Sequence, residues 1–365
     1  MLITLFVVTV LAISTFIFLQ QEKFGKRPSG ERSERIKRSP HFKNGEFKNL
    51  SNTPALTEGA SYTSILYEFF LKKKIRRIPI DLIPNKKTDL RSLDVKEDIL
   101  IWFGHSSYFM QIDGKRILVD PVLSGAASPI PSTTPSFKGS DVYTMDEFPE
   151  IDILFLTHDH WDHLDHKTTK QLKPKIKKVI TGLGTGQHLE RWGYNSNIII
   201  EKDWNEEIDL GNGFIVNTCT ARHFSGRGLK RNQALWLSFA FKTPSMNIYI
   251  GGDSGYDTHF AEIGKKFGPF DLALLENGQY DKNWKYIHMM PEEVLQAGME
   301  LNAKRIFPIH SAKFALGNHP WDEPLSRVTQ LNIQTKLNVI TPMIGEKVDL
   351  KDLSQPFTHW WTDLN

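Results

Sequence analysis

Cysteine is almost absent from this sequence, because Cys219 is the single one in 365 residues. That scarcity excludes an intramolecular disulfide and a zinc cluster built from thiolates. Any transition metal must therefore be held by imidazole and carboxylate groups. A marked excess of one charge is absent too, since 45 lysines and arginines stand against 42 aspartates and glutamates. The resulting net charge of +3 gives no reason to expect a nucleic-acid partner.

The usual signatures of a protein nucleophile are also missing. The chain contains no G-x-S-x-G sequence, and its one cysteine has no histidine partner in a suitable pattern. The glycines at 182–186 lack the lysine of a phosphate-binding loop and the full dinucleotide fingerprint, so they predict a plain strand-to-helix turn. We find no internal repeat. With 40% hydrophobic residues, the chain has the composition of a globular protein with a large core.

An uncharged apolar run occupies residues 2–19. As a helix it would be about 27 Å long, close to the thickness of the hydrocarbon layer of a membrane. A secretory signal peptide should have a basic start and a small-x-small cleavage site, and this run has neither. We therefore predict an uncleaved membrane anchor over residues 1–20, in preference to a signal peptide or a buried core helix.

Residues 21–92 begin with a basic, polar stretch that we expect to be a flexible linker through about residue 57. The positive charge beside the anchor predicts a cytoplasmic catalytic domain and attraction to anionic lipid headgroups. Residues 62–77 predict an amphipathic helix with a basic end. Those cations either complement the helix dipole or hold the helix on a membrane surface, and the sequence does not decide between the two.

Residues 93–350 show the pattern of an α/β domain, followed by a tail at 351–365. Strands at 99–104, 107–113 and 116–120 come first, with an Asp113-Gly114 turn between the last two. Later strands alternate with helices, and 338–341 is the last clear strand. This order predicts two sheets with helices outside them, a four-layer αββα sandwich. The long loop at 124–140 is a candidate lid.

The stretch THDHWDHLD at 157–165 follows a predicted strand and holds a dense set of metal-type ligands. His158 and His160 are alternate residues, so both can face the same way. Asp162 and His163 are adjacent and point differently. One ion could take the first pair and a second ion the other, as zinc sites use histidine nitrogen and carboxylate oxygen.

Three more ligand-type residues stand where predicted strands end: His223, Asp253 and His310. Strand ends are the usual location of sites in layered α/β folds. Together with the stretch at 157–165, these residues supply enough ligands for two ions.

Several motifs now identify a resemblance. They are WFGHSSYFM, LVDPVL, THDHWDHLD, ARHFSGRG, GGDSGYD, FGPFDLALLENGQYD, YIHMMPEEV and PIHSAKFALGNHPWDEP. In this order they resemble the metallo-β-lactamase superfamily, and within it the branch of N-acyl-phosphatidylethanolamine-hydrolysing phospholipase D. The resemblance covers roughly residues 99–324. A related bacterial branch contains ascorbate-phosphate lactonases.

The resemblance implies a role for each candidate residue. His158, His160 and His223 would bind one zinc, Asp162, His163 and His310 the other, and Asp253 would bridge them. His288 would be a leaving-group acid or a phosphate contact, and Asp162 would also help to orient the attacking water. His105, Asp120 and Asp165 would support the ligands or the fold. Zinc is the expected metal, although iron or manganese would suit the same ligands.

The implied reaction is hydrolysis of a phospholipid diester, in which two closely spaced ions activate a water. One departure from the branch, Glu276 to Tyr280 (ENGQY), leaves the substrate open. A lactonase or sugar-phosphate hydrolase is the main alternative, and a non-catalytic metal protein is a more remote one. The expected partners are a phospholipid or other phosphodiester and a membrane surface; whether the chain forms a homodimer stays open.

Overall fold

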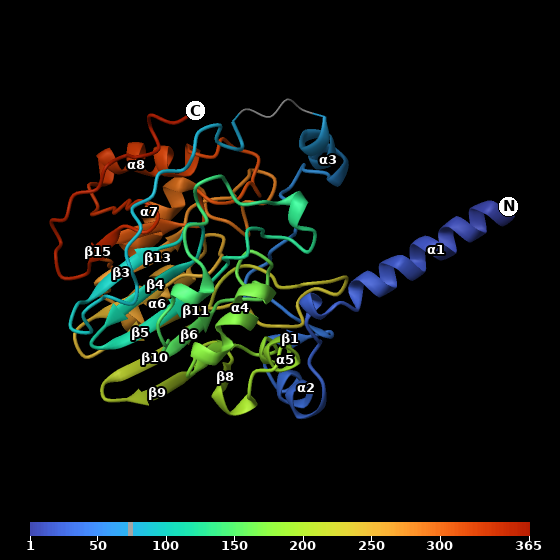
Figure 1. Ribbon diagram of the computed structural model, residues 1–365, viewed down its shortest axis with the longest axis horizontal. Helices are drawn as coiled ribbons and strands as arrows, with labels where there is room; N and C mark the ends of the chain where they lie inside the picture. The colour runs from blue at the N-terminus through green and yellow to red at the C-terminus, as the bar shows by residue number, and fades with distance from the viewer. Residues whose placement is uncertain (72–75) are drawn as a thin grey trace.

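The computed structural model describes residues 1–71 and 76–365, except the side chains of Tyr62, Leu66, Phe69 and Phe70. Two β-sheets pack face to face, and helices cover their outer faces (Figure 1). The seven-stranded sheet has the order β15-β3-β4-β5-β6-β7-β8, and the six-stranded sheet the order β14-β13-β12-β11-β10-β9. The four-layer αββα prediction is confirmed.

The bounds of the strands are as follows. The first sheet contains β3 Ile99–Trp102, β4 Tyr108–Ile112, β5 Lys115–Val119, β6 Ile153–Leu156, β7 Val179–Gly182, β8 Ile199–Lys202 and β15 Lys347–Asp349. The second contains β9 Glu207–Gly211, β10 Phe214–Cys219, β11 Ser238–Lys242, β12 Asn247–Ile250, β13 Leu272–Glu276 and β14 Ile306–Ile309. The covering helices are α4 His166–Leu172, α5 Gly186–Arg191, α6 His259–Phe267, α7 Pro291–Glu300 and α8 Glu323–Thr335.

The strand β3 shows why both faces of a sheet are buried. Leu100 and Trp102 belong to the cluster between the sheets, whereas Ile99 and Ile101 belong to the cluster with the residues of α4 and α5. Successive side chains of a strand point to opposite faces, so an unbroken apolar run is what a strand covered on both sides requires. A third cluster packs α6, α7 and α8 on the other sheet, and it contains Cys219. Burial raises the pKa of that thiol to about 12, as expected for a packing residue.

The topology brings the ends of several strands to one edge of the sandwich. The strands β5 to β8 are parallel to one another, and so are β12 to β14. The stretch at 157–165 follows β6, Asp253 follows β12, and His310 follows β14. Because parallel strands end at the same edge, residues far apart in the sequence meet there.

The N-terminal helix α1 Leu2–Leu19 projects from the body, and none of its residues is buried (Figure 1). Within the described residues it is the one helix long and apolar enough to cross a membrane, with a mean hydropathy of 2.7 over 18 residues. Length and composition alone also suit a signal sequence. The chain then forms α2 Gly30–Lys37, the short strands β1 Phe42–Lys43 and β2 Glu46–Phe47, and α3 Tyr62–Phe70.

The prediction of a flexible linker through residue 57 is wrong. Ile36 and Phe47 are buried in the cluster between the sheets. The guanidinium of Arg32 binds Glu190 at 2.7 Å and Glu201 at 2.5 Å. These contacts join residues far apart in the sequence, and a basic composition gives no sign of them. We call residues 20–57 the N-terminal arm.

Two other predictions need correction. Residues 338–341 form no strand: Val339 makes only an isolated bridge to Ile306, and the last strand is β15. The helix predicted over 62–77 begins as expected, because the Ser61 side chain accepts a hydrogen bond from the Ser64 N–H. It ends at Phe70, and residues 72–75 of the predicted helix lie outside the described part of the chain.

Candidate metal centre

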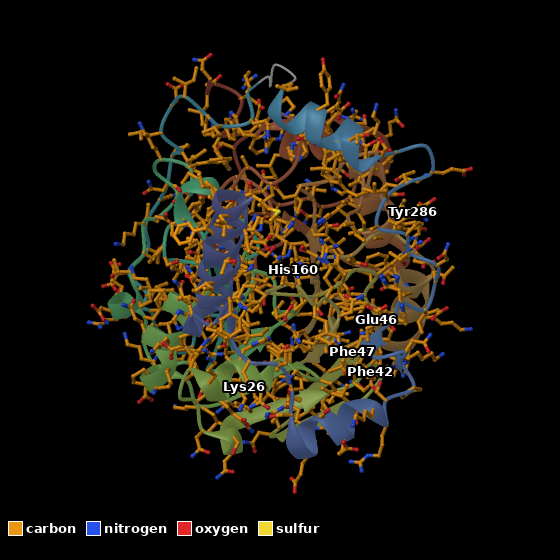
Figure 2. All side chains as sticks on the ribbon, turned by 90° about the vertical axis from the view of Figure 1, so that its right-hand side faces the viewer. Lys26, Phe42, Glu46, Phe47, His160 and Tyr286 are labelled. Atoms are coloured by element: carbon orange, nitrogen blue, oxygen red, sulfur yellow. The ribbon has the colours of Figure 1, made fainter. Side chains whose placement is uncertain are left out.

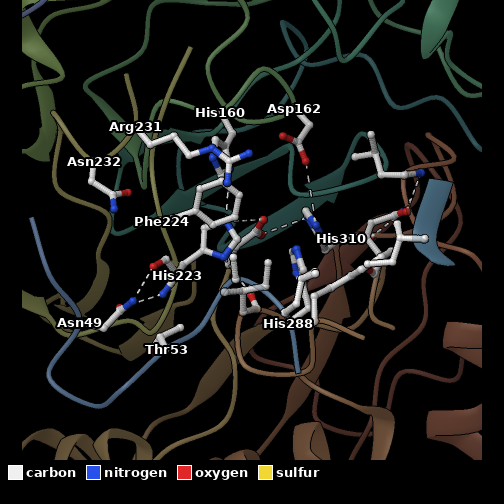
Figure 3. A pocket seen from close by; sticks show the side chains of 18 of the residues that line it. Asn49, Thr53, His160, Asp162, His223, Phe224, Arg231, Asn232, His288 and His310 are labelled. Carbon is white, nitrogen blue, oxygen red and sulfur yellow. Dashed lines mark hydrogen bonds and ion pairs between the residues drawn. The ribbon is translucent and has the colours of Figure 1, made fainter. Parts of the chain in front are cut away.

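Three imidazoles form the first ligand group, consisting of His158, His160 and His223. His158 Nε2 lies 2.8 Å from His160 Nδ1, and His223 Nε2 lies 3.2 Å from the same atom. Because these three ring nitrogens lie so close together, they could all bind the same metal ion. Figure 3 shows His160 and His223 on one side of the cavity that contains the site.

The second group contains Asp162, His163 and His310, with His105 beside them. Asp162 Oδ2 lies 3.6 Å from His163 Nε2 and 4.0 Å from His310 Nε2. His105 Nε2 lies 2.9 Å from the same carboxylate oxygen. Four potential ligand atoms of this group fall within 4.8 Å of one another. His105 therefore contacts a predicted ligand and is close enough to be a ligand itself.

Asp253 lies between the two groups. Its Oδ1 is 3.1 Å from His163 Nε2 and 3.2 Å from His310 Nδ1. Its Oδ2 is 3.9 Å from His158 Nε2 and 3.7 Å from His223 Nε2. One carboxylate oxygen thus faces each group, which is the arrangement that a bridging ligand needs.

The donor atoms suit a cation. His163 Nε2 and Asp253 Oδ1 are buried and lie 3.1 Å apart, yet neither makes a well-aligned hydrogen bond to the other or to another described residue. This pairing is costly, and a bound ion would relieve it. Burial lowers the pKa of His158 and His223 far below the usual value, which favours the neutral imidazole that binds metals. Burial lowers the pKa of His163 as well, but the neighbouring carboxylates of Asp253 and Asp162 outweigh it and raise that pKa well above the usual value.

Neighbours hold the remaining ring nitrogens of His158, His163 and His223, which fixes the orientation of these three rings. Asp120 Oδ2 is 2.8 Å from His163 Nδ1 and also accepts from the Thr157 side chain. His158 Nδ1 contacts Thr157 Oγ1 at 3.1 Å. His223 Nδ1 donates to the Ile287 carbonyl over 2.9 Å. Asp120 thus lies behind a predicted ligand, and its supporting role stays a prediction.

Asp165 lies apart from the cluster. Its side chain caps α4 by accepting from the Lys167 N–H over 3.2 Å, and it also accepts from the Ser124 N–H over 3.1 Å. These bonds fix the turn that follows the stretch at 157–165.

His288 stands at the edge of both groups. Its ring stacks on His310 at 5.3 Å between centroids, and its Nδ1 is 3.0 Å from Glu276 Oε2. Glu276 is buried at the end of β13 and also accepts from the Met289 N–H over 2.6 Å. Burial raises the pKa of Glu276 and lowers that of His288. Sequence reasoning noticed Glu276 as an unusual polar residue but assigned it no role.

Asn49 of the N-terminal arm was missed altogether. Its Nδ2 donates to the His223 carbonyl over 2.8 Å, and its Oδ1 accepts from the His223 N–H over 3.1 Å (Figure 3). The same oxygen accepts from Trp236 Nε1 over 3.0 Å. One side chain therefore clamps the backbone of a predicted ligand. A lone asparagine in a polar segment carries no local signal of such a contact.

A cavity of about 570 Å³ contains the cluster. The arm supplies part of its wall, and so does the loop after β13, with Gln279, Trp284 and Ile287. None of the described residues at 124–140 lines it, so the lid predicted there does not cover the site. Arg231 also lines the cavity, with its guanidinium 5.0 Å from the centre of the Phe224 ring.

Comparison with known families places this geometry in context. The model of the beta-lactamase superfamily domain matches residues 115–311, more than half of the chain. The chain therefore belongs to the β-lactamase superfamily and is a metal-dependent hydrolase of that fold.

Three relatives extend the comparison. An uncharacterized protein of Mycobacterium tuberculosis is 35% identical over 316 residues, which cover 85% of this chain and 84% of the relative. The N-acyl-phosphatidylethanolamine-hydrolyzing phospholipase D 1 of Caenorhabditis elegans is 29% identical, covering 69% and 71% of the two chains. A metal-dependent hydrolase of Caldivirga maquilingensis is 29% identical, with 59% and 82% covered.

Solved structures share the fold at low sequence identity. A metallo hydrolase from Ignicoccus hospitalis superposes with a TM-score of 0.52 at 20% identity, covering 69% of this chain and 98% of that one. An isothiocyanate hydrolase from Delia radicum gut bacteria gives a TM-score of 0.54 at 17% identity, covering 68% and 98%.

Proposed function

We propose that this chain is a dinuclear zinc-dependent phosphodiesterase of the phospholipase D type, acting on N-acyl-phosphatidylethanolamine-like lipids. The position of Asp253 carries the proposal, because its two oxygens face two separate ligand groups. One ion would be held by His158, His160 and His223, and the other by Asp162, His163 and His310. A pair of zinc ions supplies positive charge and a water of lowered pKa.

The residues of the chain would position the remaining partners. Asp162, with one oxygen held by His105, would orient the attacking water. His288 lines the cavity, and Glu276 fixes its ring. A hydrogen on the other ring nitrogen, Nε2, would then be directed toward the leaving oxygen of a bound diester. Arg231 places a cation at the rim of the cavity, suited to the single negative charge of a phosphodiester.

A lipid substrate is supported by the surroundings of the cavity. Ala55, Leu56 and Ile65 add apolar wall, and Ile65 belongs to α3. Figure 2 shows α1, α3 and His160 on one face of the molecule. With α1 as a membrane anchor, the cavity would open beside the bilayer. The relative from C. elegans, whose name states a phospholipid substrate, points to the same class.

The test is a substrate screen on metal-quantified protein. We expect about two zinc ions per chain and hydrolysis of N-acyl-phosphatidylethanolamine to N-acylethanolamine and phosphatidic acid. Small lactones and sugar phosphates serve as comparison substrates. A far higher kcat/KM on a lactone would replace the lipid assignment by the alternative hydrolase function. Full activity with one ion per chain would contradict the dinuclear assignment.

The anchor is tested separately by removing residues 1–19, which leaves the N-terminal arm in place. We expect the shortened chain to keep its rate on a soluble phosphodiester and to lose most of its rate on lipid in vesicles. Equal rates of the full and shortened chains on vesicle lipid would contradict the role of α1.

A further inference from the structure

A second hollow lies at the foot of α1, separate from the catalytic cavity. It measures about 350 Å³, and its wall combines three elements: the end of α1, the start of the N-terminal arm and the loop after His223. Its lining includes Phe16, Leu19, Lys26, Arg27, Leu229 and Lys230. None of the ligand residues of the metal centre lines it.

Its charge is strongly one-sided. Five cations line the hollow against one carboxylate, that of Asp159. Asp159 is already occupied, because Oδ2 lies 3.2 Å from His188 Nε2 and Oδ1 accepts from the Gly226 N–H over 2.7 Å. The hollow therefore presents positive charge that Asp159 does not neutralise.

Two of the five cations are used by the fold. Arg191 donates to the carbonyls of Gly25 and Gln20 over 2.6 and 2.7 Å. Arg227 is buried, donates to the carbonyls of Asp159 and Leu164, and lies 3.9 Å from the centre of the Trp161 ring. Lys26, Arg27 and Lys230 are exposed, and no ion pair holds them within the part of the chain that the structure describes. These three are free to bind an anion.

The apolar part of the wall indicates what kind of anion. Phe16 and Leu19 belong to the last turn of α1, so the hollow lies at the end of the apolar helix. Leu229 projects from the loop beside them with 81% of its surface exposed. If α1 crosses the bilayer, this level coincides with the lipid headgroups. Lys26 lies on the same face as His160 (Figure 2).

We propose that this hollow binds the headgroup phosphate of an anionic phospholipid, with Lys26, Arg27 and Lys230 as its ligands. The acyl chains would run along the end of α1 and past Leu229. The inference rests on the insertion of α1 given under the proposed function. It adds a lipid site that is distinct from the substrate site.

The site would also influence catalysis, because one loop forms a wall of both spaces. Phe224 packs on His160 and His223 at 4.4 and 4.7 Å between ring centroids. Gly226, Gly228 and Lys230, a few residues later, line the hollow. A headgroup that orders this loop would hold Phe224 and Arg231 in place at the catalytic cavity. We therefore expect anionic lipid to raise activity severalfold.

The direct test measures bound lipid on the full chain in detergent by native mass spectrometry, with phosphatidylglycerol and phosphatidylcholine as probes. We expect retention of one phosphatidylglycerol and no comparable retention of phosphatidylcholine. Each cation near a membrane surface contributes about fivefold in affinity. The variant Lys26→Gln/Arg27→Gln/Lys230→Gln should therefore bind phosphatidylglycerol roughly a hundredfold more weakly.

A matched control changes the net charge equally at exposed lysines outside the hollow, as Lys242→Gln/Lys265→Gln/Lys266→Gln. This control should bind phosphatidylglycerol like the unchanged protein. An equal loss in both variants would overturn the site, since overall charge would then explain the binding. Displacement of the lipid by an equal concentration of inorganic phosphate would also overturn it, because the hollow would then recognise phosphate alone.

Reconstitution separates this inference from the anchor on which it rests. The triple variant should enter phosphatidylcholine nanodiscs as well as the unchanged protein, because α1 is intact. Its rate there should equal that of the unchanged protein, whereas only the unchanged protein should be accelerated by phosphatidylglycerol. Failure of both proteins to enter nanodiscs would contradict the anchor. Equal acceleration of both would contradict the headgroup site.

Discussion

The two groups of candidate metal ligands are supported in different ways. In the second group a carboxylate supports one imidazole, with Asp120 behind His163 and Asp253 in front of it, while the Ser106 hydroxyl contacts His310. Neutral groups hold the first, namely the Thr157 hydroxyl, the Ile287 carbonyl and, through the backbone of His223, the Asn49 amide. A carboxylate behind an imidazole raises its basicity, whereas a neutral group mainly orients it. We therefore expect the second group to bind its ion more tightly.

The largest effect should come from removing a ligand of the weaker group. His160→Ala deletes the nitrogen on which the first group converges, so we expect activity to fall below detection and metal content to fall by about one ion per chain. Elemental analysis alongside the diesterase assay checks both. Retained activity would sink the assignment of this group.

Asp120→Asn should affect the second group in particular. Loss of the charge behind His163 should lower the affinity for one ion by about 10–100-fold. If the second group binds its ion more tightly than the first, the affected ion is the tightly bound one. Chelator titration followed by metal analysis measures the affinities. Asp165→Asn is the control, because its carboxylate caps α4 and contacts neither group. If Asp120→Asn weakens only the looser ion, the ranking of the two groups is reversed.

Glu276→Gln tests a pair that stands outside both groups. The glutamine can still accept the Met289 N–H bond, but it removes the carboxylate beside His288. We expect kcat to fall about tenfold, with metal content and KM nearly unchanged, since general acid catalysis contributes in this range or more. A shifted pH profile of kcat would accompany the loss. If the variant instead lost metal, we would conclude that Glu276 is itself a metal ligand.

The smallest effect should follow Asn49→Ala, which removes the clamp on the His223 backbone. We expect the first ion to bind about 3–10-fold more weakly, because the ligand stays but its orientation loosens. Asn52→Ala, an exposed asparagine of the same arm, provides the matched control. An equal change in the affinity of both ions would show that Asn49 supports the site as a whole rather than one group.

Much of the metal centre could be predicted because its residues directly follow apolar strands. The stretch at 157–165, Asp253 and His310 each lie just beyond a strand of the expected kind, and parallel strands carry such residues to one edge. Both the strands and the ligand-type residues that follow them can be recognised from a few neighbouring residues in the sequence. The αββα layering could be predicted for the same reason, because strands covered on both faces are apolar throughout.

The contributions of the arm could not be predicted in this way. Asn49 and His223 are 174 residues apart, and nothing in the residues beside Asn49 marks it as a partner. Basic composition suggested a linker, yet Arg32 is neutralised by Glu190 and Glu201 after folding. The count of charged residues in a segment does not show which of them form ion pairs with distant residues in the folded chain. The strand predicted at 338–341 was wrong for a related reason. Its pairing depends on residues distant in the sequence, and Val339 makes only an isolated bridge to Ile306.

The docked arm also sets an order of events during synthesis. Asn49 leaves the ribosome long before His223, the residue it clamps, and before Ile287, which holds the ring of that histidine. If α1 inserts in the membrane as it emerges, the N-terminal arm stays undocked beside the bilayer until the two sheets have formed. The catalytic cavity would then be completed only beside the membrane. A chain that is still being synthesised would therefore not become active before its N-terminal helix has inserted.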